Sequence, residues 1–345
     1  MKTLAIVGAG PAGLAAAWKL RDSDWESTIF EKSRGLCGRA TSRTRHGARL
    51  DPGANYLKAE SRVVKDLLFQ KLPTDELVEI PGDIWTFDGS NTLTPGDPEQ
   101  NKEPKWTYRS GISTLGKLLA EAADCSIQRE TRIQKLLPSS GGWNLLSTDG
   151  ALFEGFDAVL LTPPAPQSQE ILQASGLATL PLFNALSCAE YHRQFTFSFG
   201  LEDAPQRPGT FHALINLDGK NPVAWISFEN DKPGHIPDGV TVVGVQMQPN
   251  WSREHFEEDA AELSRIAWSH AATVLQWNDC QPQWFDSQRW KFAHPVRSAD
   301  MSLIQSHESK GLFIAGDALI GKGRVNRALE TGVEVAERID ATLRS

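Results

Sequence analysis

The chain has 345 residues, and 40% of them are hydrophobic, which suits two domains or one large α/β unit with an insertion. Its formal net charge of −8 excludes the extended basic face that nucleic-acid binding requires. No apolar run approaches the roughly 20 residues of a membrane span, and the first strand starts too early for a signal peptide, so we expect a cytoplasmic protein without a membrane span. The four cysteines are scattered, with no metal-like spacing to any histidine, so we expect reduced thiols and no metal site.

The first twenty residues predict a dinucleotide-binding turn. An apolar strand over 3–7 runs directly into a glycine-rich turn, and an apolar, helix-forming stretch follows over 14–20. Gly8 permits the tight turn, Gly10 lets the backbone approach a pyrophosphate, and Gly13 lets the helix pack on the strand. The N–H groups at the start of the helix then face the phosphates. We assign the following residues of the turn to the cofactor: Gly8, Gly10, Pro11, Ala12 and Gly13.

A second strand over 27–30 ends in Glu31, 18 residues after Gly13. A carboxylate at this place accepts hydrogen bonds from ribose hydroxyls and repels a 2′-phosphate. Residues 32–57 are rich in Gly and Arg, and we expect a loop that faces cofactor phosphates rather than a solvated basic loop. The strand, the helix and the acidic strand end together favour dinucleotide binding over a glycine turn used only for packing.

The middle of the chain alternates short helices and strands. In chain order, the pattern predicts a helix over 61–71, irregular strands and loops over 73–104, a helix from Gly111 with Ser113 as its N-cap, strands over 126–128 and 133–137, a hairpin around Asp149-Gly150, and a strand over 158–162.

The last part of the chain first changes character and then returns to the opening style. The alternating stretches 195–199 and 240–246 predict half-buried antiparallel strands, interrupted by one acidic amphipathic helix over 253–276. A buried strand over 311–316 follows and ends at Asp317. After a glycine loop, a helix carries apolar residues at helical spacing from Val325 to Leu343. The nucleotide-binding domain is therefore expected to be discontinuous.

Six short motifs in a fixed order give the chain a resemblance to the amine-oxidase-like flavoproteins, and most closely to the renalase family. The resemblance covers essentially the whole length. The motifs are Lys32-Ser33-Arg34-Gly35, Cys37-Gly38-Arg39, Asp51 to Tyr56, Gly111-Ile112-Ser113, Arg289-Trp290 and Gly316-Asp317.

The resemblance implies an α/β fold in which an α+β, antiparallel-sheet domain for the substrate is inserted into a Rossmann-type FAD-binding domain. We expect the FAD-binding domain to comprise 1–60, 107–166 and 296–345. The substrate-binding domain then comprises 61–106 and 167–295.

Physical roles for FAD follow from the positions of these motifs. Arg39 and Arg43 can bind the pyrophosphate through charge-assisted hydrogen bonds, and Asp317 is placed for the ribityl or pyrophosphate region. The helix that begins near Asn326 would direct its N-terminus at the pyrimidine end of the flavin. Together with the glycine turn, we assign these residues to non-covalent FAD: Glu31, Lys32, Gly38, Arg39, Arg43, Gly53, Ala54, Asn55, Tyr56, Ile133, Thr162, Gly316, Asp317, Arg324, Val325 and Ala328.

The chain departs from the pattern of the renalase family at three positions. Cys37 replaces the first glycine of Gly-Gly-Arg, and Asn55 replaces the usual Gln beside the flavin ring. Gln246 lies on the strand where some bacterial renalases carry His. These departures bear on the identity of the substrate more than on FAD binding.

The chain carries a single nucleotide fingerprint, which indicates a substrate that gives a hydride directly to the flavin, with O2 as the final acceptor. The resemblance implies misreduced isomers of NAD(P)H as the donor, which are oxidised to NAD(P)⁺ with formation of H2O2. No acid–base residue is obligatory, and we name no catalytic residue; His294 is interpreted as a loop histidine. The candidate substrate pocket consists of Asn55, Tyr56, Trp225, Gln246 and Trp290.

Two alternatives stay open. The first is an FAD-dependent amine oxidase or isoprenoid desaturase. Amine oxidases often place a lysine near the flavin on a strand that aligns with 193–199, and this stretch contains none. The second is a flavin-binding protein without turnover. No cysteine follows Cys280, which disfavours a covalent flavin, and the oligomeric state stays open.

Overall fold

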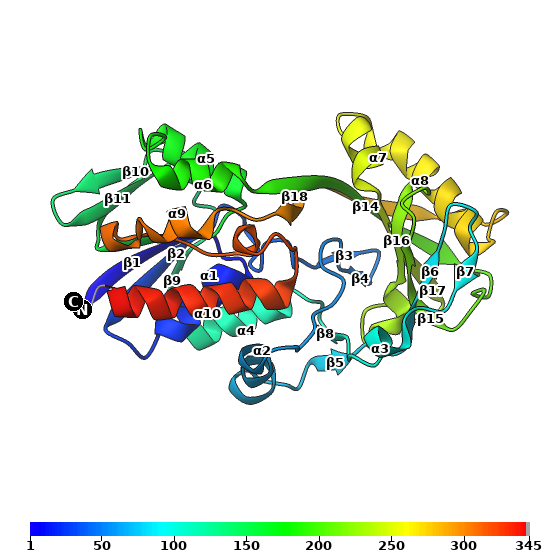
Figure 1. The fold of residues 1–345 in the computed structure, drawn as a ribbon. Coiled ribbons are helices and arrows are strands. Elements are labelled where there is room, and N and C mark those ends of the chain that lie inside the picture. Colours follow the sequence, from blue (N-terminus) through cyan, green and yellow to red (C-terminus); the bar gives the residue numbers. More distant parts are fainter. Residues whose placement is uncertain (343–345) are drawn as a thin grey trace.

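The computed structural model describes residues 1–342 and arranges them in two lobes that long strands connect (Figure 1). The first lobe contains a five-stranded sheet in the order β19-β13-β1-β2-β9, in which every neighbouring pair is parallel. Leu4, Ile6 and Leu160 are fully buried, as in strands covered on both faces. The strands are β1 (Lys2–Val7), β2 (Trp25–Phe30), β9 (Ser126–Gln128), β13 (Ala158–Leu161) and β19 (Leu312–Ile314).

Helices cover both faces of the five-stranded sheet, because alternate apolar residues of β1 point to opposite sides. One face carries α1 (Pro11–Leu20), α4 (Thr114–Ala123) and α10 (Val325–Thr342). The other face carries α5 (Ala165–Ala174), α6 (Pro181–Ser187), α9 (Met301–Gln305) and the antiparallel sheet of β10 (Ile133–Ser139), β11 (Gly142–Ser147) and β12 (Leu152–Phe156). This arrangement confirms the predicted Rossmann-type α/β fold.

The second lobe contains a seven-stranded sheet in the order β18-β14-β17-β16-β15-β6-β7. It is antiparallel except for the parallel pair of β15 and β6, which agrees with the predicted α+β insertion. Helices α7 (Pro249–Glu254) and α8 (Ala260–Leu275) cover one face, and the other face looks toward the first lobe. The strands are β6 (Asp83–Phe87), β7 (Leu93–Thr94), β14 (Glu190–Glu202), β15 (Phe211–Asn216), β16 (Val223–Phe228), β17 (Val240–Met247) and β18 (Trp284–Arg297).

Short elements connect the two lobes or lie beside them. They are the hairpin of β3 (Arg43–Arg45) and β4 (Ala48–Leu50), helix α2 (Arg62–Asp66) with the π-helical turn η1 (Leu67–Lys71), the pair β5 (Leu77–Glu79) and β8 (Trp106–Tyr108), helix α3 (Pro98–Asn101), and the 3-10 turns η2 (Glu229–Asp231), η3 (Glu308–Lys310) and η4 (Asp317–Leu319).

Several expectations for local structure were wrong. The helix expected over 253–276 is broken, because Asp259 accepts hydrogen bonds from the N–H groups of Ala261 and Glu262 and starts α8 afresh. Ser113 occupies the N-cap position of α4, but its hydroxyl caps no N–H group. The loop expected over 32–57 contains the hairpin of β3 and β4. Leu343 lies outside the described residues.

Strand β14 is not half-buried as its alternation predicted, because residues 195–201 are buried on both faces. One face holds Phe195, Phe197 and Phe199 against the helical layer, where Phe199 lies 5.1 Å from the ring of Trp268. The other face carries the smaller residues Thr196 and Ser198. A strand whose two faces are both covered by other parts of the protein lacks the exposed face that a period of two normally indicates.

The packing suggests different limits for the two domains, and we propose them here. Helices α5 and α6 lie within the range 167–295 expected for the substrate domain, yet they share a core with the five-stranded sheet. Likewise, Val64 and Leu68 in the range 61–106 pack in the core with α1 and α10. We therefore place the segments 61–72 and 167–187 with the FAD-binding domain.

Candidate active site

A cleft of about 2020 Å³ lies between the two lobes. It runs over the carboxyl ends of β1, β2, β13 and β19, where open parallel sheets bind ligands. All the residues assigned from the sequence line this cleft, with the exception of Gly13 and Arg43. The long strand β18 contributes a continuous stretch of the wall, from Gln288 to Val296.

The glycine turn has the shape that a bound pyrophosphate needs. Gly8 has a φ of +103°, which favours glycine. A Cβ on Gly13 would lie 2.2 Å from the carbonyl oxygen of Gly8, so this glycine serves the packing of helix on turn and stays outside the cleft wall. A Cβ on Gly10 would meet no atom within 4 Å, because the open cleft lies there. The first turn of α1 also has no side-chain cap, which leaves its N–H groups free for an anion.

Glu31 lies at the end of β2 and is nearly buried. Its carboxylate accepts hydrogen bonds from the backbone N–H groups of Ala9 and Ser33, both at 2.8 Å. Each oxygen therefore keeps a lone pair for a ribose hydroxyl. Lys32, the next residue of the chain, also lines the cleft, and its side chain donates a hydrogen bond to Gln167 at 3.3 Å.

Arg39 and Asp317 form an ion pair across the middle of the cleft, with 2.8 Å between Nη1 and Oδ2. Tyr191 donates its hydroxyl hydrogen to the other oxygen of Asp317 at 3.1 Å. Burial lowers the pKa of the Arg39 guanidinium, but Asp317 outweighs burial and holds the pKa above its usual value. The carboxylate fixes Arg39 by one nitrogen, so the remaining N–H groups can meet a phosphate.

Arg43 does not take the position beside a pyrophosphate that we expected. Its guanidinium lies 3.1 Å from Asp286 of β18 and also donates to the side chain of Gln288. Arg45 of the same hairpin lies 2.9 Å from Asp286. Because strand β3 directs both arginines toward β18, the side chain of Arg43 holds the hairpin to the second lobe and does not line the cleft.

The segment 52–55 forms the part of the wall where the resemblance places the flavin ring. The Gly53 carbonyl accepts hydrogen bonds from Gln246 at 3.0 Å and from Asn55 at 3.5 Å. The indole of Trp290 donates to the Pro52 carbonyl at 3.0 Å. A Cβ on Gly53 would come within 1.9 Å of the Arg39 carbonyl oxygen. Three of the five candidate pocket residues therefore hold the backbone of this segment.

Tyr56, the next residue of the chain, and Trp225 of β16 also line the cleft, with 6.2 Å between their ring centroids. Burial raises the pKa of Tyr56, and the nearby Arg324 opposes this rise only in part. Asn55 accepts a hydrogen bond from Ser227 at 3.1 Å. The wall here consists of aromatic rings and amides, which bind a flat, neutral ring and carry no group that titrates near neutral pH.

His192 and His294 line the cleft as an edge-to-face pair with 5.2 Å between ring centroids. Burial, together with His192, Arg324 and Arg39, lowers the pKa of His294 to about 4. Burial and Arg253 lower the pKa of His192. Both imidazoles are therefore neutral at pH 7.

A buried ionic cluster joins the two lobes behind segment 52–55. The Lys232 ammonium is 0% exposed and lies 3.1 Å from Asp51 and 2.9 Å from Glu229. His235 lies 3.2 Å from the other oxygen of Glu229. Asp51, Glu229 and His235 form the group of possible metal ligands found within residues 1–342. The ammonium of Lys232 already bridges the two carboxylates, so we assign this cluster a structural role.

The sequence reasoning missed several residues of the cleft. Lys58 lies two positions after the Asp51 to Tyr56 motif, and Ile215 and Thr86 lie on strands that carry no motif. His192 pairs in register with His294 on the neighbouring strand, which only the sheet reveals. The alternation of side chains along each strand could have shown that these residues share one face of the sheet. It could not have shown that this face lines the cleft.

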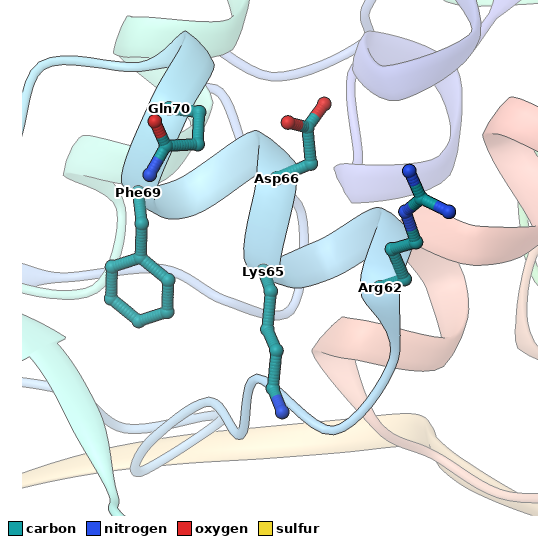
Figure 2. Close-up of a pocket in the computed structure, with 5 residues that line it drawn as sticks. All are labelled: Arg62, Lys65, Asp66, Phe69 and Gln70. Carbon is teal, nitrogen blue, oxygen red and sulfur yellow. The ribbon is translucent and has the colours of Figure 1, made fainter.

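A second, smaller hollow of about 370 Å³ lies on α2 and the π-helical turn after it. Figure 2 shows the side chains that line it, which are Arg62, Lys65, Asp66, Phe69 and Gln70. It contains no residue assigned from the sequence and lies apart from the glycine turn. We therefore place the active site in the large cleft.

Fold and cleft together have the form of a dinucleotide-binding protein in which a second lobe faces the ends of the parallel strands. Residues 6–72 match the NAD(P)-binding Rossmann-like domain, and residues 89–340 match the flavin-containing amine oxidoreductase family. The chain belongs to the flavin-containing amine oxidoreductase family and is an FAD-dependent oxidoreductase. No helix among residues 1–342 is long and apolar enough to cross a membrane.

Solved structures of diverse enzymes have the same fold over almost their full length. Reduced UDP-galactopyranose mutase matches with a TM-score of 0.78 at 11% identity, covering 100% of this chain and 95% of that one. A redesigned putrescine oxidase matches at 0.77 and 14% identity, covering 100% and 99%. Cyclohexylamine oxidase from Brevibacterium oxydans IH-35A matches at 0.76 and 12% identity, covering 100% of both chains. Identities this low establish the fold alone.

Proposed function

We propose that this FAD-dependent oxidoreductase is a renalase-like oxidase of dihydronicotinamide dinucleotides that carry their hydride at the wrong ring position. The substrate loses a hydride and becomes NAD(P)⁺. O2 takes up the two electrons and the proton of that hydride together with one proton from solvent, and leaves as H2O2. The wider family includes amine oxidases by its description, so the choice between these two substrate classes is the central question.

The charge of the cleft carries the proposal. Lys and Arg outnumber Asp and Glu in its lining by eight to five. Four of the cationic side chains have no ion-pair partner among residues 1–342: Lys58, Lys291, Lys322 and Arg324. Glu60 and Asp97 keep their negative charge but already accept hydrogen bonds, Glu60 from Asn326 at 3.0 Å and Asp97 from the N–H groups that start α3. Such a field attracts the phosphates of a dinucleotide and repels an ammonium substrate.

The chemistry near segment 52–55 is consistent with a donor that needs no proton transfer. A dihydronicotinamide that gives up a hydride becomes a stable aromatic cation, so no base has to remove a proton. The side chains of Asn55, Gln246 and Trp290 are neutral, and they hold the backbone instead of reaching for a proton. The described strand β14 has no lysine over 193–199.

FAD, when bound, supplies the hydride acceptor and the path of electrons to O2. This chain would hold it with the glycine turn at the pyrophosphate, Glu31 at the ribose, and Arg39 with Asp317 in the middle of the cleft. The open space over Gly10, the uncapped start of α1 and the cleft volume fit such a group. The protein orients the donor and excludes competing reactions.

An aerobic assay of the purified, FAD-loaded protein tests the proposal. O2 uptake, H2O2 and NAD⁺ are measured with the 2- and 6-dihydro isomers of NAD(P), with ordinary NADH, and with a panel of primary and secondary amines. We expect stoichiometric NAD⁺ and H2O2 from the isomers and slow turnover of NADH. Turnover of an amine alone would replace the proposal with amine oxidation, and no turnover at all would indicate a flavin-binding protein.

Charge variants test the observation itself. We expect Lys58→Gln to raise KM for a dihydro-NAD isomer about three- to tenfold with little change in kcat, because it removes attraction common to ground and transition states. Lys65→Gln is the matched control, since Lys65 is exposed and lies outside the cleft. An unchanged KM in Lys58→Gln, or an equal rise in both variants, would contradict the electrostatic argument.

A further inference from the structure

We infer that the second nucleotide of the substrate, the adenosine half, lies across the outer half of the seven-stranded sheet, with Ile215 at the centre of its binding surface. The inference rests on the proposed function for the identity of the ligand. It assigns a role to the part of the cleft that lies beyond the flavin-side segment and that carries none of the sequence motifs.

The strand register builds this surface as one transverse row. Gln246 of β17 lies opposite Trp225 of β16, and Trp225 lies opposite Ile215 of β15. Ile215 lies opposite Thr86 of β6, and Thr86 lies opposite Thr94 of β7. Residues directly opposite one another in a sheet point to the same face. All five line the cleft, so the row forms a continuous floor from the flavin side to the sheet edge.

The length of this floor fits more than a nicotinamide ring. Four steps between neighbouring strands separate β17 from β7, which gives about 19 Å at the usual strand spacing. Gln246 and Trp225 border the segment 52–55, where the ring-binding side chains meet. Three strands of open floor lie beyond Trp225. A small amine would leave this part of the cleft empty.

The chemistry of the outer floor suits a nucleoside. Ile215 and Leu217 are 42% and 70% exposed, and they offer an apolar surface on which a flat base can lie. The amides of Asn216 and Gln248 border them, with 3.1 Å between Gln248 Nε2 and Asn216 Oδ1. The Asn216 amide nitrogen donates to the Phe87 carbonyl and to Asp218, so it is Gln248 that keeps its oxygen and one N–H for further hydrogen bonds. Such a mixed border favours a base with a ribose over a purely apolar chain.

Lys58 provides the link between the two halves of the cleft. It follows the pocket residue Tyr56 by two positions and lies near Lys105, whose pKa it lowers in addition to burial. Lys105 precedes β8, which pairs with β5 close to the start of β6. Lys58 therefore carries its charge between the ring end and the outer floor, where the pyrophosphate of a dinucleotide would pass.

The experiment compares a complete and a shortened substrate in the wild type and in a variant of the floor, using the FAD-loaded full chain. The substrates are the 6-dihydro isomers of NAD and of nicotinamide mononucleotide, which lacks the adenosine half. The variant is Ile215→Glu, which places an acid in the floor at an exposed position. The matched control is Ile266→Glu, since Ile266 is also 42% exposed, lies in the same lobe on α8, and does not line the cleft.

For the wild type we expect kcat/KM to be at least about tenfold higher with the dinucleotide than with the mononucleotide. Ile215→Glu should lower the value for the dinucleotide at least about fivefold and leave that for the mononucleotide within about twofold, whereas Ile266→Glu should change neither. Equal values for the two substrates in the wild type would overturn the inference. Equal losses for both substrates in Ile215→Glu would overturn it as well.

A binding measurement separates this inference from the proposed reaction. NAD⁺ and nicotinamide mononucleotide are titrated into the same proteins, and the change in the flavin absorbance reports binding without turnover. If no isomer is oxidised but NAD⁺ binds about tenfold more tightly than the mononucleotide and loses this advantage in Ile215→Glu, the reaction is wrong and the surface is right. If NAD⁺ shows no advantage over the mononucleotide, the surface is wrong whatever the reaction.

Discussion

The two ends of the cleft are built in different ways. At the cofactor end, neighbouring residues of the chain make the glycine turn: a strand, the turn itself and a helix start all lie within the first twenty residues. At the substrate end, the floor comes from strands up to 160 positions apart, since Thr86 and Gln246 belong to one transverse row. A local site depends on turn geometry, whereas a floor assembled by register depends on the whole sheet.

The two ends of the cleft also differ in whether their charged side chains are paired. In the middle of the cofactor end, Arg39 is paired with Asp317. Elsewhere in the cleft, Lys58 and Lys291 have no ion-pair partner among the described residues. Paired charges fix geometry, whereas unpaired charges can attract a ligand of opposite charge. Under the proposed function, the comparison therefore separates a preformed cofactor site from a substrate site that an anionic ligand would complete.

The largest effect is expected where the two regions join. Lys232→Met removes the ammonium between Asp51 and Glu229 and leaves two buried carboxylates uncompensated. We expect a loss of about 3–5 kcal/mol in the free energy of unfolding, measured by urea denaturation. Lys220→Met, at an exposed site, should cost less than about 0.5 kcal/mol. A cost below about 1 kcal/mol for Lys232→Met would show that the lobes do not depend on this cluster.

The next test addresses the local cofactor site. The Cβ introduced by Gly10→Ala meets no protein atom, but it occupies the space that we assign to the pyrophosphate. We expect the Kd for FAD to rise about thirtyfold, or about 2 kcal/mol, with the melting temperature of the FAD-free protein unchanged. Gly35→Ala is the control, because its Cβ also meets nothing within 4 Å and lies outside the cleft. Equal affinities of both variants for FAD would place the pyrophosphate elsewhere.

A pH series tests the neutral histidine pair at the cleft wall. The pKa of His294 is about 4 in the folded protein and about 6.5 when unfolded. The unfolded chain binds the extra proton between these values, so the FAD-free protein loses stability as the pH falls from 6.5 to 4. We expect His294→Gln to lose up to about 2 kcal/mol less over this interval in thermal or urea unfolding. Parallel stability curves for both proteins would mean that His294 is protonated in the fold.

The smallest effect is expected for Arg43→Gln, which tests the correction made to the cofactor site. Because Arg43 forms an ion pair with Asp286 and does not line the cleft, the Kd for FAD should stay within about twofold of the wild type. Arg39→Gln serves as the comparison and should weaken FAD binding at least about tenfold, because a charge-assisted hydrogen bond to phosphate is lost. A similar loss in both variants would return Arg43 to the pyrophosphate.

The fold could be predicted where the local pattern and the tertiary environment agree. An apolar run, a glycine-rich turn and the change from strand to helix periodicity predict strand β1, helix α1 and the acidic strand end at Glu31. The break between α7 and α8 was missed because the acidic run reads as a solvated helix face, whereas Asp259 acts as a cap. The burial of both faces of β14 was missed because the sequence of a strand does not show which other elements cover its faces.

The residues of the candidate site show the same difference between local pattern and tertiary environment. Gly8, Gly10 and Asp317, which the sequence assigns to the cofactor, line the cleft, since turns and strand ends determine where they lie. It could not place Ile215 or Lys58, because their role depends on strand order and on the approach of two lobes. Arg43 was misplaced for the same reason: its direction is set by the hairpin of β3 and β4, which carries no strong turn signal.

Anaerobic reduction of the bound flavin tests the central claim most directly. The FAD-loaded protein is mixed with one equivalent of 6-dihydro-NAD in a stopped-flow instrument, and the flavin absorbance is followed. We expect complete bleaching within seconds with this isomer, release of one equivalent of NAD⁺, and much slower bleaching with ordinary NADH or with amines. Bleaching by an amine and not by the isomer, or no bleaching above background, would contradict the assignment of the cleft to an anionic dihydronicotinamide.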